Sequence, residues 1–428
     1  MLADRLARAL EARGIHYAWV MAALAFFYVL FSTSALGVPG VLILPMSQDL
    51  GMTIGELSAP QGLRFVMFGA MAPFAGGLML RYGPRRIVAF AGVLLMVGLV
   101  VTATIASQWQ LWLGIGVILG IAPGLTALQI NAIISSRWFA ARRGLVVGLM
   151  GGASATGVLI FMPLAAWIAE HWGWRMALLP SGIGIAVMVG LAQLLFRDRP
   201  QELGLPAYGE TAMQPIPPRP QGNFVRISFE MLSLGIRRPV FWILSGAFAI
   251  CGVSSFGVTQ AHLVPYCGDI GIPMVTAAWL LAVIGVFDLI GTVGSGWLSD
   301  RYDNRWLLAG YYGFRGLSLI WLVLSDTSLA GLTVFAVVYG LDFIATMPPT
   351  VKLTIATFGR EAGPALLAWI FAAHQFGSGA FAALAGSSRD AVGSYVPAFF
   401  VAGLLCLVAA ASFVAVRRPT RAPSPAPA

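Results

Sequence analysis

The sequence predicts an all-α membrane protein with twelve transmembrane helices in two similar six-helix bundles. Three observations predict this fold class. First, 58% of the 428 residues are hydrophobic and only 10% are charged, whereas soluble domains carry roughly 25% charged residues. Second, apolar stretches long enough to cross a bilayer recur twelve times. Third, a short basic motif recurs at half the chain length, which indicates duplicated bundles.

The expected spans each contain about 20 residues, the length that a helix needs to cross the hydrocarbon core. The first six are 16–38, 61–80, 87–106, 111–134, 144–168 and 176–196. The second six are 239–265, 275–299, 306–325, 328–350, 363–387 and 395–416. Residues 1–14 are polar and basic, and the first span has no small-residue cleavage site near its end. We therefore expect an uncleaved first helix rather than a signal peptide.

The spans divide the chain into four parts. These are an N-terminal six-helix bundle (1–196), a cytoplasmic linker (197–238), a C-terminal six-helix bundle (239–416) and a disordered tail (417–428). The linker is polar and rich in proline, with a surface helix expected around Phe224–Leu234. Prolines should kink or end several spans. They are Pro73, Pro123, Pro163, Pro348 and Pro349.

The basic residues predict the orientation of the helices. Of the 26 lysines and arginines, 22 lie on one side if both termini are cytoplasmic. Arg175 and Arg389 lie on the other side, and Arg64 and Arg315 lie within helices. Such asymmetry follows the positive-inside rule, so the net charge of +9 reflects topology rather than nucleic-acid binding. The single lysine, with abundant alanine and glycine, indicates a GC-rich bacterial genome and hence a bacterial inner (plasma) membrane.

The repeated motif follows helix 2 and helix 8. Gly76, Arg81, Tyr82 and Arg85 recur 220 residues later as Gly296, Arg301, Tyr302 and Arg305. This pattern resembles the signature of the major facilitator superfamily, in which an acidic residue before the arginine helps latch the cytoplasmic side. The second copy keeps that acid as Asp300, whereas the first copy has Leu80. The resemblance implies a conformational latch made of Gly76, Arg81, Arg85, Gly296, Asp300, Arg301 and Arg305.

A finer resemblance covers helix 5. Trp138-Phe139, Arg142-Arg143-Gly144 and the glycines that follow are similar to the monocarboxylate porter and oxalate–formate antiporter branch. The resemblance implies transport of a monocarboxylate-like anion with a proton by alternating access. In better-understood members of that branch, an arginine in helix 8 binds the carboxylate. Helix 8 of this chain has no arginine, and its charged residue is Asp288.

Four charged residues lie within the expected spans. A charge at the bilayer centre costs at least about 2.5 kcal/mol on insertion scales, so these residues are functional candidates. Arg64, one turn from the outer end of helix 2, attracts anions or forms an external gate, or it snorkels to the headgroups. Arg315, near the middle of helix 9, pairs with Asp288 or Asp342, or it contacts substrate. Each of the two aspartates is a proton-coupling group or part of a fixed ion pair.

Polar residues in other spans complete the candidate site. His374 and Gln375 lie midway along helix 11, where a histidine relays protons or binds anions, or is a hydrogen-bonded core residue. Hydroxyl and amide groups in helices 1, 4 and 7 could supply further hydrogen bonds. The predicted substrate-binding set is Arg64, Tyr28, Gln129, Asn131, His374 and Gln375, with Gln260 and His262 as weaker candidates.

The sequence therefore favours a secondary active transporter of a small organic solute. Two alternatives stay open: an exporter of hydrophobic or cationic compounds, and a transporter-like sensor that binds without moving solute. The chain lacks P-loop, GxSxG and HExxH motifs, so we expect no enzyme. The three cysteines are far apart, so we expect no metal and no cofactor. The expected partners are the solute, a proton and the lipid bilayer, with no nucleic acid, and the protein is expected to function as a monomer.

Overall fold

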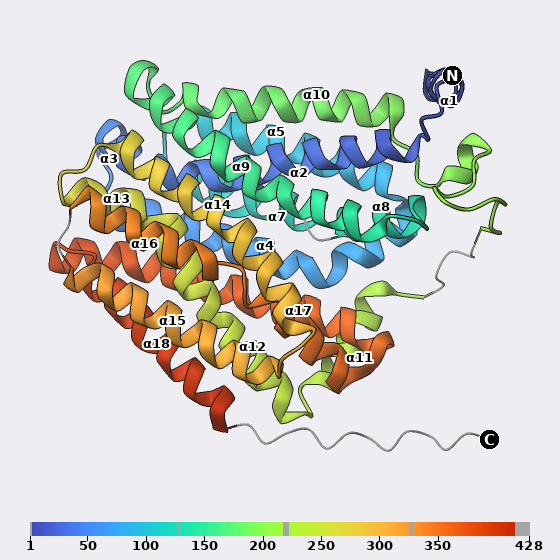
Figure 1. Cartoon of the computed structure of the whole chain (residues 1–428). Helices are drawn as coiled ribbons and strands as arrows, with labels where there is room; N and C mark the ends of the chain where they lie inside the picture. Colours follow the sequence, from blue (N-terminus) through green and yellow to red (C-terminus); the bar gives the residue numbers. More distant parts are fainter. Residues whose placement is uncertain (1, 127–128, 217–221, 326–327, 416–428) are drawn as a thin grey trace.

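The computed structural model describes residues 2–126, 129–216, 222–325 and 328–415. The predicted tail from 417 onward lies outside this range. Within it the fold is helical, and twelve helical segments are long and apolar enough to cross a membrane, as predicted. In Figure 1, α2, α5 and α10 lie together in the upper part, and α12, α15 and α18 lie together in the lower part, inclined to the first set.

The first six segments make up what we call the first half. They are α2 (Ala18–Val41), α4 (Ile54–Tyr82), α5 (Pro84–Ala103), a fourth segment, α9 (Arg143–Trp172) and α10 (Leu179–Leu195). The fourth segment consists of α6 (Gln108–Leu111), the π-helix η1 (Trp112–Ile118), α7 (Leu119–Gly124) and α8 (Gln129–Trp138). Short helices lie outside the spans: α1 (Leu2–Glu11), α3 (Ile43–Leu50), η2 (Met176–Leu178) and η3 (Pro200–Leu203).

The second half contains the other six segments. The seventh consists of α12 (Pro239–Gly252), the π-helix η4 (Val253–Gln260) and α13 (Ala261–Asp269). It is followed by α14 (Met274–Ser299), α15 (Asn304–Leu324), α16 (Leu329–Asp342), α17 (Met347–Val392) and α18 (Val396–Ala415). Helix α17 contains the last part of segment ten and the whole of segment eleven. Gly359, which has a φ of +80°, turns the chain between these two segments. The linker forms α11 (Phe224–Gly235), close to the predicted surface helix.

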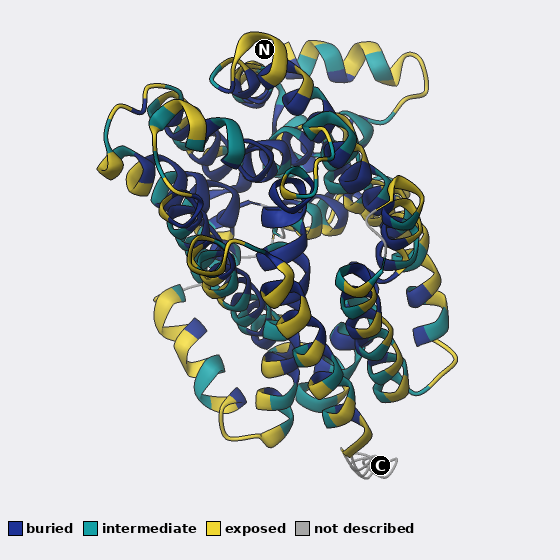
Figure 2. Ribbon diagram, turned by 90° about the vertical axis from the view of Figure 1, so that its left-hand side faces the viewer, coloured by how far each residue is buried: buried dark blue, intermediate teal, exposed yellow. Residues whose placement is uncertain are grey.

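We name the two ends of the bundle by their position relative to the linker. The linker side holds α1, α11 and the loops at 82–84, 138–143 and 299–304, and the far side holds α3 and the loops at 104–107, 270–273 and 393–395. Exposed residues gather on the outer surfaces of the helices and buried residues lie between them (Figure 2). Many exposed side chains are large and apolar, such as Val293 and Leu324 at 68% and 73% exposure. Such a surface suits lipid rather than water.

The predicted start of helix 2 at residue 61 is wrong, because α4 begins at Ile54. A capping box starts it: the Thr53 hydroxyl accepts from the Glu56 amide at 3.2 Å, and the Glu56 carboxylate accepts from the Thr53 amide at 2.9 Å. The polar stretch before residue 61 is therefore helical. Arg64 consequently lies nearly three turns inside the helix rather than one.

Segment ten is broken in the middle, between the end of α16 at Asp342 and the start of α17 at Met347. Pro348 and Pro349 lie in the first turn of α17, as expected of prolines next to a helix break. Pro73 and Pro163, in contrast, lie inside the continuous helices α4 and α9.

Side chains from neighbouring helices bond the backbone of this break. Arg315 donates to the carbonyl oxygens of Asp342 and Phe343, the second at 2.9 Å. Asp288 accepts from the Ile344 amide at 2.9 Å. Non-helical backbone at membrane depth requires such partners. Arg315 and Asp288, two of the four charged residues within the expected spans, thus stabilise the broken turn. Arg315 bonds two of its carbonyl oxygens, and Asp288 bonds one of its amides.

Candidate functional site

A cavity of about 270 Å³ lies between the two halves. Its walls come from α2, α4, α7, α8 and α9 on one side, and from α12, η4, α17 and the break of segment ten on the other. Its polar lining residues include Ser32, Thr33, Thr126, Asn131, Ser154, Ser255 and His374. One wall belongs to a π-helix, a distortion that is frequent at functional sites. We call this space the central cavity.

Several polar atoms on its walls lack a hydrogen-bond partner. They are the hydroxyl of Ser32, the amide oxygen of Asn131 and Nδ1 of His374, and all three are buried. Buried polar atoms are normally paired, so unpaired ones facing a cavity call for a ligand or water. The first two belong to the first half and the third to the second half. A solute bonded to all of them would touch both halves at once.

His374 lies in a cluster of aromatic rings. Its ring centroid is 4.8 Å from that of Phe248, 5.4 Å from that of Phe256 and 5.9 Å from that of Phe371. Its Nε2 lies 3.4 Å from the hydroxyl of Ser255. The imidazole therefore packs among aromatic rings and has one hydroxyl neighbour.

The described lining of the central cavity contains no Asp, Glu, Lys or Arg. Asp288 lines a side recess of about 70 Å³ that shares Phe256, Phe343 and Ile344 with the central cavity. Its carboxylate accepts from Thr292 at 3.1 Å and from the Ile344 amide, and no described cation lies within 4.0 Å. The cavity therefore has neither a net positive nor a net negative wall.

Arg315 lies directly behind the wall of the second half. Its Nε donates to Asp342 Oδ2 at 2.8 Å, and its Nη1 donates to the sulfur of Cys251 at 2.7 Å. Both charged side chains are almost fully buried. The sequence left open whether Arg315 pairs with Asp288 or Asp342, and the structure pairs it with Asp342. Arg315 reaches the cavity only through Cys251 and the carbonyl of Phe343, which line it.

Arg64 has a different environment. Its Nη2 donates to Gln61 at 2.9 Å, and its guanidinium lies 4.8 Å from the centre of the Phe65 ring. Its Nε and Nη1 are buried without a partner, and no described carboxylate lies within 4.0 Å. Arg64, Tyr28 and Gln375 are buried but lie outside the walls of the central cavity, whereas Asn131 and His374 lie on them.

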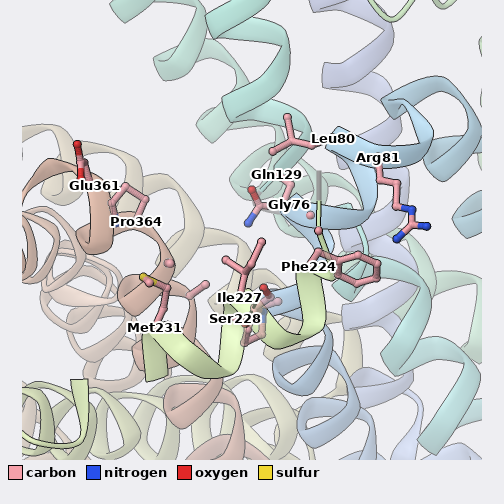
Figure 3. Close-up of a pocket in the computed structure, with 16 residues that line it drawn as sticks. Gly76, Leu80, Arg81, Gln129, Phe224, Ile227, Ser228, Met231, Glu361 and Pro364 are labelled. Carbon is pink, nitrogen blue, oxygen red and sulfur yellow. Dashed lines mark hydrogen bonds between the residues drawn. The ribbon is translucent and has the colours of Figure 1, made fainter. Parts of the chain in front are cut away.

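A second cavity of about 390 Å³ opens on the linker side, between α4 and α17 (Figure 3). Gln129, the remaining predicted substrate-binding residue, points into it beside Gly76. Helix α11 lies across it and contributes Phe224, Ile227 and Met231 to its lining. Its walls continue those of the central cavity: along α4 from Phe68 to Ala72 and Gly76, and along α17 from Phe371 to Ala368 and Pro364. The two cavities therefore follow one path from the centre to the linker side.

The two copies of the basic motif bond differently. In the first copy, which has Leu80 at the acidic position, Asp198 from the end of α10 accepts from the Arg85 amide at 2.8 Å. In the second copy Asp300 accepts from Lys352, and this bond holds the pKa of the Asp300 carboxyl below its ordinary value of 3.8. Arg301 stacks on Trp297, Arg305 pairs with Asp303 at 2.7 Å, and Arg81 lies 5.5 Å from the Tyr82 ring. None of these contacts joins the first half to the second.

Most of the cavity wall was not predicted from the sequence. Ser32, Thr33, Ser154 and Ser255 are small hydroxyl residues in apolar helices, and the phenylalanines look like ordinary lipid-facing residues. One signal was available for Ser154, because it lies among the glycines of the fifth span, at 148, 151, 152 and 157. Asp198 was also missed, because it lies outside the motif that it completes.

The fold and the cavity define a polytopic helical membrane protein of the transporter class. The chain belongs to the Major Facilitator Superfamily, whose family model matches residues 21–350 and 262–428. Its relatives include monocarboxylate transporter 13 of Bos taurus, 27% identical over 81% of this chain and 76% of the relative, and monocarboxylate transporter 11 of Homo sapiens, 28% identical over 96% and 85%. The predicted resemblance to the monocarboxylate branch is thus confirmed.

Two bacterial proteins are also similar. The uncharacterized MFS-type transporter YcxA of Bacillus subtilis is 25% identical over 80% of this chain and 81% of its own. The crystal structure of a bacterial homolog of the human lysosomal transporter Spinster, in an inward-facing and occupied conformation, matches with a TM-score of 0.71 at 16% identity. That match covers 92% of this chain and 96% of the other, and it shows the shared fold.

Proposed function

We propose that this protein is a secondary transporter that moves a small monocarboxylate-like anion together with a proton by alternating access. The observation that carries the proposal is the central cavity, whose unpaired polar atoms lie on both halves. A solute bound there couples the two halves mechanically. The relatives named as monocarboxylate transporters favour a carboxylate as that solute.

The neutral wall is the reason to propose a proton. An anion that enters a dry cavity without a cation loses its hydration at a cost of several kcal/mol. The described wall offers no Lys or Arg to offset that cost. One proton per monoanion makes the occupied cavity neutral. Either His374 on the wall or Asp288 in the adjoining recess is placed to hold that proton, while Asp342 is engaged by Arg315.

The proposed orientation follows the distribution of basic residues, with the linker side in the cytoplasm of a bacterium. The bundle division at 197–238, the monomeric state and the absence of enzymatic activity stay predictions with it.

An exporter of cationic compounds is the second candidate function. The observation that favours it is the carboxylate of Asp288, which faces a recess without a described cation beside it.

Uptake into proteoliposomes tests the proposal. We expect labelled lactate or pyruvate to enter faster with an inward proton gradient than at equal pH, and His374→Gln or Asp288→Asn to abolish the stimulation. His171→Gln and Asp49→Asn are matched controls, because both residues lie away from the two cavities. An uptake rate of the wild-type protein that is the same with and without the proton gradient would exclude proton coupling. Uptake of an organic cation instead would favour the exporter.

A further inference from the structure

The size of the central cavity exceeds what lactate or pyruvate needs. A buried apolar cavity of about 150 Å³ holds a benzene ring. The central cavity measures about 270 Å³, which leaves room for a ring and for a carboxylate beside it. The volume therefore accommodates a solute with a larger body than lactate or pyruvate.

The apolar part of the wall is aromatic. Five phenylalanines line it: Phe68, Phe248, Phe256, Phe343 and Phe371. Phe68 and Phe371 meet edge to face at 5.6 Å across the two halves, and Phe256 lies 6.1 Å from Phe343. The imidazole of His374 joins these two pairs and Phe248, because it lies within 5.9 Å of Phe248, Phe256 and Phe371. Aromatic rings prefer such edge-to-face and offset contacts with one another. A ring in the solute would extend this set.

Two polar groups of the second half lie close together on the wall. His374 and Ser255 lie 3.4 Å apart, and His374 touches three of the phenylalanines. A carboxylate bonded to His374 therefore places the carbons attached to it against the rings. The described wall has one group that can carry a positive charge, so it suits one carboxylate and not two.

We infer that the central cavity selects monocarboxylates with an aromatic body, such as an arylacetate, over small hydroxy or oxo acids. This inference rests on the proposed function and deepens it by naming the substrate class. The carboxylate binds at Nδ1 of His374 in the second half, because the Ser255 hydroxyl already donates to the Cys251 carbonyl at 2.6 Å. The ring contacts Phe68 from the first half and Phe371 from the second. Binding of the ring then joins the halves independently of the polar contacts.

The test compares phenylacetate with lactate in counterflow at equal pH inside and outside the vesicles, with protein-free vesicles to subtract passive entry of the acids. We expect a KM for phenylacetate at least about tenfold lower than that for lactate, because the ring buries more apolar surface. Phe371→Leu should shrink this ratio. Phe314→Leu, at a residue that is 63% exposed on the outer surface of α15, should leave it unchanged. Size-exclusion profiles identify variants that fail to fold.

The outcomes separate the inference from the function on which it rests. Lactate transport with an equal or weaker response to phenylacetate would overturn the substrate class and leave the monocarboxylate transporter intact. Counterflow of neither acid by a folded protein would overturn both. A preference for phenylacetate that is unchanged in both Phe371→Leu and Phe68→Leu would overturn the placement of the ring.

Discussion

Helices α4 and α17 face each other along the bundle, and their two ends differ. On the far side the backbones touch: a side chain at Gly62 would clash with the carbonyl of Gly379, and one at Gly379 with the carbonyl of Gly62. Asp390 also accepts from the Gly55 amide at 2.8 Å. On the linker side the same helices border a cavity of about 390 Å³, and α11 lies across it. The structure is thus closed at one end and open at the other.

The difference indicates how the halves move. Glycines permit the close contact on the far side, whereas the linker side depends on a separate helix to fill the space between the halves. Ser228 of α11 joins both, because its hydroxyl donates to the Pro73 carbonyl at 3.2 Å and its carbonyl accepts from the Trp369 indole at 3.1 Å. We expect the far side to open by parting glycine contacts and the linker side to close by displacing α11.

The largest expected effect concerns the stability of the second half, which holds one side of both ends. Asp342→Asn removes the charge opposite Arg315 and leaves a buried guanidinium unpaired, so we expect a loss of about 3–5 kcal/mol in stability. The midpoint of thermal unfolding in detergent measures it. Glu230→Gln is the control, since its pair with Arg226 is largely exposed and should contribute about 0–1 kcal/mol. Equal midpoints for the two variants would contradict a structural role for the buried pair.

The closed end is tested by Gly62→Val. The added side chain must push the carbonyl of Gly379 away, so we expect the far side to open and transport to fall at least about tenfold, corresponding to about 1.4 kcal/mol or more. Distances between spin labels at Glu56→Cys and Val392→Cys report the opening. Gly190→Val is the matched control because nothing lies within 4 Å of its added carbon. An unchanged label distance in Gly62→Val would show that the glycine contact does not hold this end.

The open end is tested by Trp369→Phe. This variant keeps the ring but loses the bond to the Ser228 carbonyl, which contributes about 0.5–1.5 kcal/mol. We expect α11 to leave more often and labels at Leu80→Cys and Glu361→Cys to show a larger population of short distances. Trp321→Phe is the control, because its side chain is 42% exposed on α15 and does not line the linker-side cavity. No change in the population would mean that α11 does not hold the linker side open.

The smallest effect concerns Asp300 and Lys352 on the linker side. Because the bond lowers the pKa of Asp300 below 3.8, its contribution is fully present above that pH and is lost as the pH falls through the lowered pKa. Wild type and Asp300→Asn should therefore differ by the same small amount at pH 8 and pH 5. They should converge only under more acidic conditions. A difference in unfolding midpoint that varies between pH 5 and pH 8 would implicate another group.

The sequence predicted the number of spans because twenty apolar residues leave few alternatives to a membrane helix. Its error at α4 has a specific cause. Glu56, Ser58 and Gln61 look like a loop, but they are satisfied by the capping box and by bonds to the carbonyls of Ile54 and Pro39. The partner of Arg315 was not predictable from one sequence, since Asp288 and Asp342 were equally eligible. The break in segment ten distinguishes the two aspartates, because Asp342 there accepts from Arg315 whereas Asp288 accepts from the Ile344 amide.

The linker has a consequence for the freedom of the two halves. Its first part is docked on the first half, because Tyr208 bonds the backbone of Trp138, Ala140 and Ala141 at 2.8–3.0 Å. Its last part, α11, is docked across α4 and α17. The linker has 42 residues (197–238). Its described residues between Tyr208 and α11 have no such hydrogen bonds to either half. The tether between the halves is therefore much shorter than its sequence length. A gene split within that stretch would leave each fragment with its own anchored end for reassembly.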